Sequence, residues 1–166
     1  MFISRIGFQV TTKDAPNAGT DSLLTMEVLR NGNHLWTGRL DFPDLNDNER
    51  GDSRFYGYTF RSLFLDRTPH LPDGIGRIPM PYPDRGMEFS DGLNGHLRCR
   101  LHNNGDDMWI KDQVNVHVRI IRQRATSFDT LDWIEDNDWT FVGSFTQDVA
   151  LSTDSHEGVE RWTMAV

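Results

Sequence analysis

Residues 101–120 read LHNNGDDMWIKDQVNVHVRI, and the character of this stretch changes halfway. Its first part, residues 102–107, is rich in amide and carboxylate side chains and is typical of a loop. Its last part alternates apolar and polar residues from Val114 to Ile120, which predicts a strand with one buried face. Trp109 stands between the two parts. The stretch therefore predicts a binding loop that an aromatic anchor fixes to the end of a buried strand.

Two earlier segments share the composition of this loop. Residues 15–22 combine proline, glycine and asparagine with Asp21, and residues 41–52 are irregular and acidic. Each of them follows a predicted strand or hairpin. We therefore expect three polar loops at one end of a β-sandwich.

Alternating apolar residues predict the strands of this sandwich. The predicted strands are Ile6–Val10, a hairpin over Leu23–Leu40 that turns at Asn31-Gly32, Arg54–Phe60, Leu97–Leu101, Val114–Ile121, Trp139–Phe145 and Val159–Val166. Phe128, Leu131 and Ile134 recur at helical spacing, which predicts one short helix within Thr126–Asp138. The sequence thus predicts an all-β fold, an antiparallel sandwich of about eight strands that forms a single domain over residues 1–166.

The segment Arg61–Gly95 contains five of the seven prolines of the chain and is rich in glycine. This density excludes a central strand or the interior of a helix. We expect a long surface insertion that faces a partner and is ordered only where its apolar residues contact the sandwich. Those residues are Phe64, Leu65, Ile75, Ile78, Met80 and Tyr82.

Composition narrows the classes of function. Seventeen basic and twenty-five acidic residues give a formal net charge of −8, which disfavours nucleic acid and a bare anionic membrane as partners. A single cysteine, Cys99, excludes an internal disulfide, and its alternation with Leu97 and Leu101 predicts a small core residue. No apolar run is long enough for a membrane-spanning helix. Residues 1–10 lack the order of a signal peptide, so we expect a cytoplasmic protein as synthesised, with export by another route left open.

The chain resembles the PLAT domain, the β-sandwich shared by polycystin, lipoxygenases and a clostridial alpha-toxin. Four segments carry this resemblance, in the order in which the family has them. They are Ala18-Gly19-Thr20-Asp21, Leu40-Asp41 at the end of the hairpin, residues 48–55 (NERGDSRF), and residues 102–114 (HNNGDDMWIKDQV). Asn103 stands where the family tends to carry aspartate. The resemblance covers residues 6–121 apart from the insertion, and it implies a PLAT-like sandwich.

The three loops together offer the oxygen ligands that Ca²⁺ prefers, namely carboxylates, amide carbonyls and hydroxyls. Family members that bind calcium take ligands from the same loops, so the resemblance implies Ca²⁺ as a cofactor here. The candidate ligands are Asn17, Gly19, Thr20, Asp21, Asp41, Asp44, Asp47, Glu49, Asn103 and Asp106, with Asn104 and Asp107 beside the last two. The alternative is that these are ordinary solvated turn residues.

Apolar residues within the acidic loops are candidates for contact with a membrane or a partner. Phe42, Leu45 and Met108 fit this role, because no periodicity buries the first two. Trp109 has two interpretations: it inserts into a membrane interface at the loop tip, or it closes the end of the core. Because it leads directly into a buried strand, we favour the core.

The sequence contains no recognisable catalytic motif. The six histidines lack metal-ligand spacing, and neither a nucleophile elbow nor a phosphate-binding glycine loop is present. We therefore expect a non-catalytic recognition module that binds a lipid or membrane surface, or a protein partner, with the assistance of calcium. The alternative is a calcium-independent structural subunit that uses its insertion and C-terminal tail as an interface. An enzyme is the third hypothesis.

Overall fold

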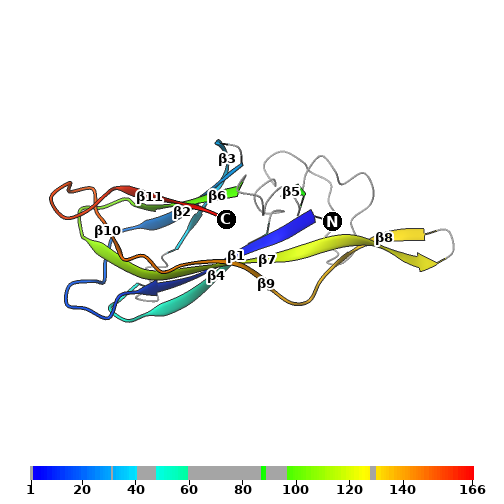
Figure 1. The fold of residues 1–166 in the computed structure, drawn as a ribbon, viewed down its shortest axis with the longest axis horizontal. Coiled ribbons are helices and arrows are strands. Elements are labelled where there is room, and N and C mark those ends of the chain that lie inside the picture. Colours follow the sequence, from blue (N-terminus) through cyan, green and yellow to red (C-terminus); the bar gives the residue numbers. More distant parts are fainter. Residues whose placement is uncertain (1, 31, 41–47, 60–86, 89–96, 128–129) are drawn as a thin grey trace.

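The structure is a computed structural model that describes residues 2–30, 32–40, 48–59, 87–88, 97–127 and 130–166. Its strands form two antiparallel sheets, which lie one over the other as a sandwich (Figure 1). The larger sheet contains β1 (Phe2–Thr12), β4 (Ser53–Thr59), β5 (Met87–Glu88), β7 (Trp109–Ser127), β8 (Thr130–Glu135), β9 (Thr140–Phe145) and β10 (Val149–Leu151). The smaller sheet contains β2 (Leu24–Arg30), β3 (Asn33–Arg39), β6 (Leu97–Asn103) and β11 (Arg161–Ala165), in the order β11-β6-β2-β3. The predicted all-β sandwich is confirmed.

Strand β7 is the spine of the larger sheet. It is 19 residues long and pairs with β1 along one edge from Lys111 to Ile121. Its other edge pairs in succession with β10, β9 and β8. The β7–β8 hairpin projects at the end of the molecule opposite the loops that join β1 to β2 and β6 to β7 (Figure 1). One strand thus connects the loop end of the sandwich to its far end.

The core lies between the inner faces of the two sheets. Strands β1 and β7 contribute alternate residues from the larger sheet, and β2 and β6 contribute alternate residues from the smaller one. The fully buried members include Ile6, Phe8, Val10, Val114, Val116, Val118, Met26, Val28, Leu97, Cys99 and Leu101. Burial of each large apolar side chain contributes roughly 1.5–3 kcal/mol. The predicted core position of Cys99 is confirmed, and burial raises the pKa of its thiol to about 12.

A β-bulge in β7 sets which residues face the core at the loop end. Thr11 pairs with Gln113 while Thr12 pairs with Lys111, so Asp112 is an extra residue on β7. One extra residue reverses the alternation of side chains beyond it. Even-numbered valines face the core on one side of the bulge, and the odd-numbered Trp109 and Lys111 do so on the other. Because of the bulge, the side chains of Trp109 and Lys111 point into the interior.

Lys111 is a buried cation between the two sheets. Its side chain has no exposed surface, its Nζ donates hydrogen bonds to the carbonyl oxygens of Phe145 (3.0 Å) and Asp112 (3.2 Å), and it lies 4.7 Å from the ring centroid of Trp162. Burial lowers the pKa of Lys111 from its usual 10.5 to about 8, although nearby carboxylates raise it in part. Burial of the Lys111 ammonium therefore disfavours its charged form in the folded protein.

The predicted helix within Thr126–Asp138 is wrong. Residues 121–127 of β7 pair with residues 130–135 of β8, and no helix occurs in the described part of the chain. The reason is that β7 extends past the sandwich, where its free edge exposes backbone N–H and C=O groups. A returning strand satisfies these groups, whereas a short isolated helix is marginal and would leave them unpaired.

The structure adds three short elements to the predicted strands. They are β5, β8 and β10, which bring the described strands to eleven rather than about eight. Within the proline-rich insertion only Met87–Glu88 is described, and it pairs with residues 2–3 of β1 as a two-residue edge strand. The apolar residues of the insertion that we expected to contact the sandwich lie outside the described residues. Among the described residues, no helix has the length and apolar character needed to cross a membrane.

The pKa of Lys111 predicts how stability depends on pH. In the unfolded chain this lysine stays protonated up to about pH 10.5, whereas in the folded protein it loses its proton near pH 8. The unfolded state binds more protons between these values, so the free energy of unfolding rises with pH across that window. Between pH 8 and pH 9 the free energy of unfolding of the wild type should rise by about 1 kcal/mol more than that of Lys111→Met, as measured by urea denaturation.

Lys13 is the matched control, because it is the only other lysine of the chain and its side chain is 40% exposed. Lys13→Met should keep the pH dependence of the wild type. If Lys111→Met follows the wild-type curve between pH 8 and 9, the lysine is not desolvated as described.

Candidate functional site

The Ala-Gly-Thr-Asp segment is fixed by its first two residues. Ala18 is fully buried, and its carbonyl oxygen accepts a hydrogen bond of 2.9 Å from the backbone N–H of Ile110 at the start of β7. A Cβ atom on Gly19 would lie 3.0–3.3 Å from the backbone of residues 48–50. Only glycine permits so close an approach of two loops without a shift of one of them. The first and second polar loops are therefore in direct backbone contact.

Thr20 and Asp21 join the first loop to the third. The Thr20 Oγ1 donates to the carbonyl oxygen of Asp107 (3.1 Å), and the backbone N–H of Asp21 donates to the Asp107 carboxylate (2.8 Å). The backbone N–H of Thr20 also donates to the carbonyl oxygen of Asn48 (3.4 Å). The first and third loops therefore lie together, as the sequence predicted. Asp107 joins them by accepting hydrogen bonds from Thr20 and Asp21.

Asn48 stabilises the second loop from inside. Its side chain is almost fully buried, its φ is 67°, and its Nδ2 donates to the carbonyl oxygen of Leu40 (2.6 Å). Asparagine tolerates this left-handed conformation better than most residues. Asn48 therefore joins the end of the β2–β3 hairpin to the residues that face the first loop.

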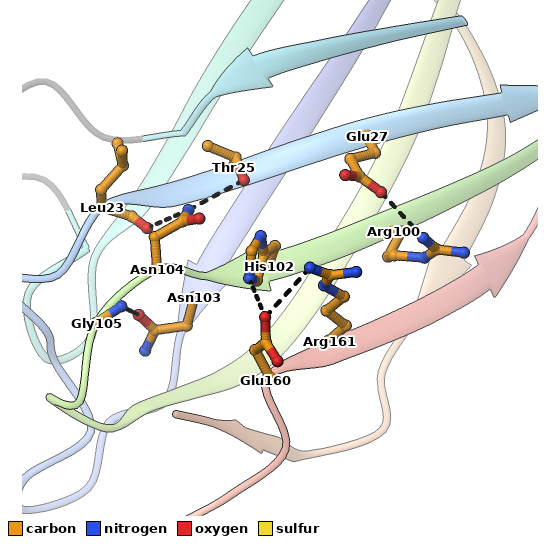
Figure 2. A network of polar contacts seen from close by, with 10 residues as sticks. All are labelled: Leu23, Thr25, Glu27, Arg100, His102, Asn103, Asn104, Gly105, Glu160 and Arg161. Atoms are coloured by element: carbon orange, nitrogen blue, oxygen red, sulfur yellow. Dashed lines mark hydrogen bonds and ion pairs between the residues drawn. The ribbon is translucent and has the colours of Figure 1, made fainter. Parts of the chain in front are cut away.

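Asn103 has a comparable role in the third loop. It is fully buried, and its Nδ2 donates to the carbonyl oxygens of Asp107 and Leu151, both at 2.8 Å. Its Oδ1 accepts from the backbone N–H of Gly105 (3.0 Å), as Figure 2 shows. These bonds use the amide to shape the loop. The structure therefore gives Asn103 a supporting position in the loop, and its role as a ligand stays a prediction.

A pocket of about 260 Å³ opens where the three loops meet. It is lined by Asn17, Gly19, Thr20, Asp21, Glu49, Arg50 and Asp107. Five of the predicted ligands therefore share one cavity. Arg50 is the counter-charge in this lining, and its Nε lies 2.6 Å from a carboxylate oxygen of Asp14. The pocket thus combines three carboxylates with one guanidinium that is itself ion-paired.

The remaining predicted residues fall into two groups. Asp41, Asp44, Asp47, Phe42 and Leu45 lie outside the described residues. Asp106 is exposed and not part of the pocket lining, and its carbonyl oxygen accepts a hydrogen bond from Ser152 Oγ (2.8 Å). Met108 is half-buried between the loop and Trp109. Trp109 is fully buried with its Nε1 donating to Thr12 Oγ1 (2.9 Å), which confirms its predicted core position.

A fourth segment supports the site and was missed by sequence reasoning. Ser152 is buried beside the third loop, and the backbone N–H of Thr153 donates to the carbonyl oxygen of Gly105 (3.0 Å). The Ser152 hydroxyl also accepts from the backbone N–H of Asp154 (3.0 Å). A serine hydroxyl that accepts from the backbone N–H two residues later is a common turn. The sequence Ser152-Thr153-Asp154 could therefore have predicted this turn.

The donor set of the pocket fits a hard cation in its chemistry. Carboxylate, amide and hydroxyl oxygens are the ligands of Ca²⁺, which requires six to eight of them in adaptable geometry. Among the described residues, however, no three His, Cys, Asp or Glu side chains are grouped closely enough to hold a metal ion. The described loops therefore bring carboxylate, hydroxyl and amide oxygens to one pocket without forming a complete metal site by themselves.

Basic residues lie on the outer face of the smaller sheet, next to the third loop. In Figure 2, Arg100 contacts Glu27 at 3.2 Å, and His102 and Arg161 both contact Glu160, at 2.8 and 3.2 Å. Strand β6 presents Arg98, Arg100 and His102 on this face because they alternate with buried residues. This alternation was visible in the sequence, yet only the pairing of β6 with β11 adds Arg161 to it.

Comparisons with known proteins bear on the fold. No protein-family profile matches the chain, and no curated protein sequence matches it. The crystal structure of a lipoxygenase variant matches with a TM-score of 0.50 and 15% identity, over 98% of this chain and 16% of that one. Clostridium perfringens alpha-toxin matches with a TM-score of 0.49 and 14% identity, over 86% of this chain and 32% of that one.

Coral 8R-lipoxygenase, a structure described in terms of calcium activation via a C2-like domain, matches with a TM-score of 0.43 and 17% identity, over 90% of this chain and 17% of that one. At such identities the likeness is one of fold alone. This chain spans between 16% and 32% of the length of these three proteins. The chain therefore has the PLAT-like β-sandwich fold that its sequence resemblance implied, and it shares that fold with a small part of a lipoxygenase.

Proposed function

We propose that this chain is a non-catalytic recognition module whose loop end binds Ca²⁺ and, with it, a lipid or membrane surface. The observation that carries the proposal is the pocket at which Asp21, Glu49 and Asp107 meet from three separate loops. Acidic residues from three loops would attract a cation that enters this cavity, and their carboxylate oxygens are the ligands that Ca²⁺ prefers. The likeness in fold to a lipoxygenase agrees with this class of module without defining its ligand.

The chain's own residues have separate tasks in this proposal. Asp21, Glu49 and Asp107 would provide charged oxygens, and Asn17 and Thr20 would complete the set with neutral ones. Asn48 and Asn103 position the loops through bonds to backbone carbonyls. Bound calcium would supply positive charge at the loop end of a chain with net charge −8. That charge attracts anionic headgroups, which the acidic loops alone would repel.

The outer face of the smaller sheet favours the same approach. Arg98 is exposed on this face at the end of β6 away from the third loop, and Arg100 and Arg161 are ion-paired with Glu27 and Glu160. The exposed guanidinium of Arg98 attracts an anionic surface, within the short range that salt screening leaves. Calcium binding would then decide whether the loop end itself is attracted or repelled.

Calcium should raise the melting temperature of the protein. A ligand that binds only the folded state stabilises it by about 2.7 kcal/mol when its free concentration is a hundred times its dissociation constant. For a domain of this size that corresponds to about 5–10 °C. Asp107→Asn keeps an oxygen that accepts from the Asp21 N–H but removes a negative charge. This variant should lose most of the calcium-induced rise in melting temperature. Without calcium it should be as stable as the wild type or slightly more stable.

The control for this experiment is Asp138→Asn, an exposed aspartate in the segment between β8 and β9, which should retain the full shift. Magnesium should have a smaller effect because it requires a tighter octahedron and releases water reluctantly. Identical melting curves in millimolar calcium and in chelator would refute the calcium site and favour the structural-subunit hypothesis.

Vesicle binding should depend on calcium and on the apolar residues of the loops. Phe42→Ala should weaken co-sedimentation with phosphatidylserine-containing vesicles and leave the melting temperature nearly unchanged. Trp109→Ala should instead lower the free energy of unfolding by about 3–5 kcal/mol, because it empties a fully buried site. The opposite pattern, with Phe42→Ala destabilising the fold and Trp109→Ala releasing the vesicles, would contradict both assignments.

A further inference from the structure

An aromatic cluster lies on the outer face of the larger sheet, away from the calcium pocket. It consists of Phe55 on β4, His117 on β7, Trp139 just before β9 and Phe141 on β9, and we call it the aromatic platform. Phe55 contacts Trp139 and His117 with ring centroids 5.1 and 5.8 Å apart, and His117 contacts Phe141 at 5.6 Å. Phe55 is 47% exposed and Phe141 is 57% exposed. The middle of the sheet thus presents a large aromatic surface to solvent, a feature typical of a binding face.

Two glycines beneath the platform are needed for its geometry. Gly7 and Gly57 face each other in register on β1 and β4. A Cβ atom on Gly7 would overlap the Phe55 ring and lie 3.1 Å from Trp139, and one on Gly57 would lie 3.3 Å from both rings. Glycine weakens a strand interior and usually marks a close approach of another group. Here the rings of Phe55 and Trp139 lie directly on the backbone of the sheet.

A row of neutral polar side chains borders the platform. Gln9, Asn115 and Ser144 occupy neighbouring positions on β1, β7 and β9. The Asn115 Nδ2 donates to Gln9 Oε1 (3.3 Å), and the Gln113 Nε2 donates to Asn115 Oδ1 and Ser144 Oγ, both at 2.9 Å. Each of these groups retains donors or acceptors for a further partner. We call these four residues the amide row.

Neither the platform nor the amide row contains a charged side chain, although a quarter of the residues in the chain are charged. Burial also lowers the pKa of His117, which keeps its ring neutral at neutral pH. The guanidinium of Arg119 borders the platform, but it stacks on Trp139 at 5.1 Å and lies 3.7 Å from the Glu135 carboxylate. This chemistry selects a neutral ligand over an anionic polymer or an acidic peptide.

We propose that the aromatic platform and the amide row form a binding site for a neutral polysaccharide chain. The apolar C–H faces of sugar rings pack against aromatic faces, whose negative quadrupole attracts polarised C–H bonds. Sugar hydroxyls are donors and acceptors that match planar amides and a serine hydroxyl. The centroids of Phe55 and Phe141 lie 5.8 and 5.6 Å from the His117 ring between them, a spacing that suits two consecutive sugar units. This site is independent of the calcium pocket.

Affinity gel electrophoresis of the full chain tests this site, with hydroxyethylcellulose, soluble starch or galactomannan in the gel. At least one of these neutral polysaccharides should retard the wild type, equally in calcium and in chelator. Phe141→Ala should weaken the retardation by about fivefold or more. Its melting temperature should not change, because the ring is mostly exposed. Phe55→Ala and Gln113→Ala should weaken binding in the same direction, whereas Val159→Ala, at an exposed apolar residue elsewhere, should bind as the wild type.

Several results would overturn the proposal. One is the absence of retardation by all three polysaccharides, and another is equal retardation of Phe141→Ala and the wild type. A third is that Phe141→Ala releases phosphatidylcholine vesicles without affecting polysaccharide, which would make the platform a membrane contact. A fourth is that Phe141→Ala converts a dimer into a monomer in light scattering while no polysaccharide binds, which would assign the face to a second copy. Polysaccharide binding is expected to be equal in calcium and in chelator. Its loss would therefore not bear on the calcium proposal, and a failure of the calcium proposal would not bear on this one.

Discussion

The bulge at Asp112 is the constraint on which the loop end of the molecule depends. Because β7 carries one more residue than β1 at this point, the side chains beyond it change sides, and Trp109 enters the core. With Trp109 buried and bonded to Thr12, the third loop leaves the sheet at a fixed place. Ile110 then donates its backbone N–H to Ala18, which fixes the first loop beside it. A single inserted residue thus sets the positions of two loops.

Buried polar side chains hold the loops together with the buried Trp109. Asn48, Asn103 and Ser152 are each almost fully buried, and each one donates to a backbone carbonyl of a neighbouring segment: Leu40, Leu151 and Asp106 respectively. Backbone amides in loops have no strand partner, and leaving them unpaired in the interior would cost about as much as a lost hydrogen bond. These three side chains replace the missing partners. The consequence is that acidic residues from three loops line one pocket.

The two faces of the larger sheet serve different purposes. Its inner face is the apolar core, whereas its outer face exposes aromatic rings over paired glycines and a row of amides. The two proposed sites are thus separate, with a charged pocket at one end of the sandwich and a neutral surface on a sheet face.

Sequence periodicity was sufficient for most of the fold, because apolar side chains at every second position line one face of a strand and cannot line one face of a helix. It identified the β2–β3 hairpin, β4, β6 and the buried half of β7. It failed at Thr126–Asp138, where three apolar residues suggested a helix. The free edge of β7 determines the outcome there, and an unpaired edge is a property of the assembled sheet that no local window of sequence contains.

For the candidate site, the sequence by itself determined which loops bear oxygen-rich side chains and that Trp109 anchors one of them. Only the tertiary structure decided that Asp107, rather than Asp106, reaches the pocket, and that Asn103 supports the loop. Adjacent residues in a turn differ in direction, and that direction follows from hydrogen bonds to Thr20, Asp21 and Leu151 far away in the chain. The aromatic platform was likewise invisible in the sequence, because Phe55, His117 and Phe141 come from three strands that only register brings together.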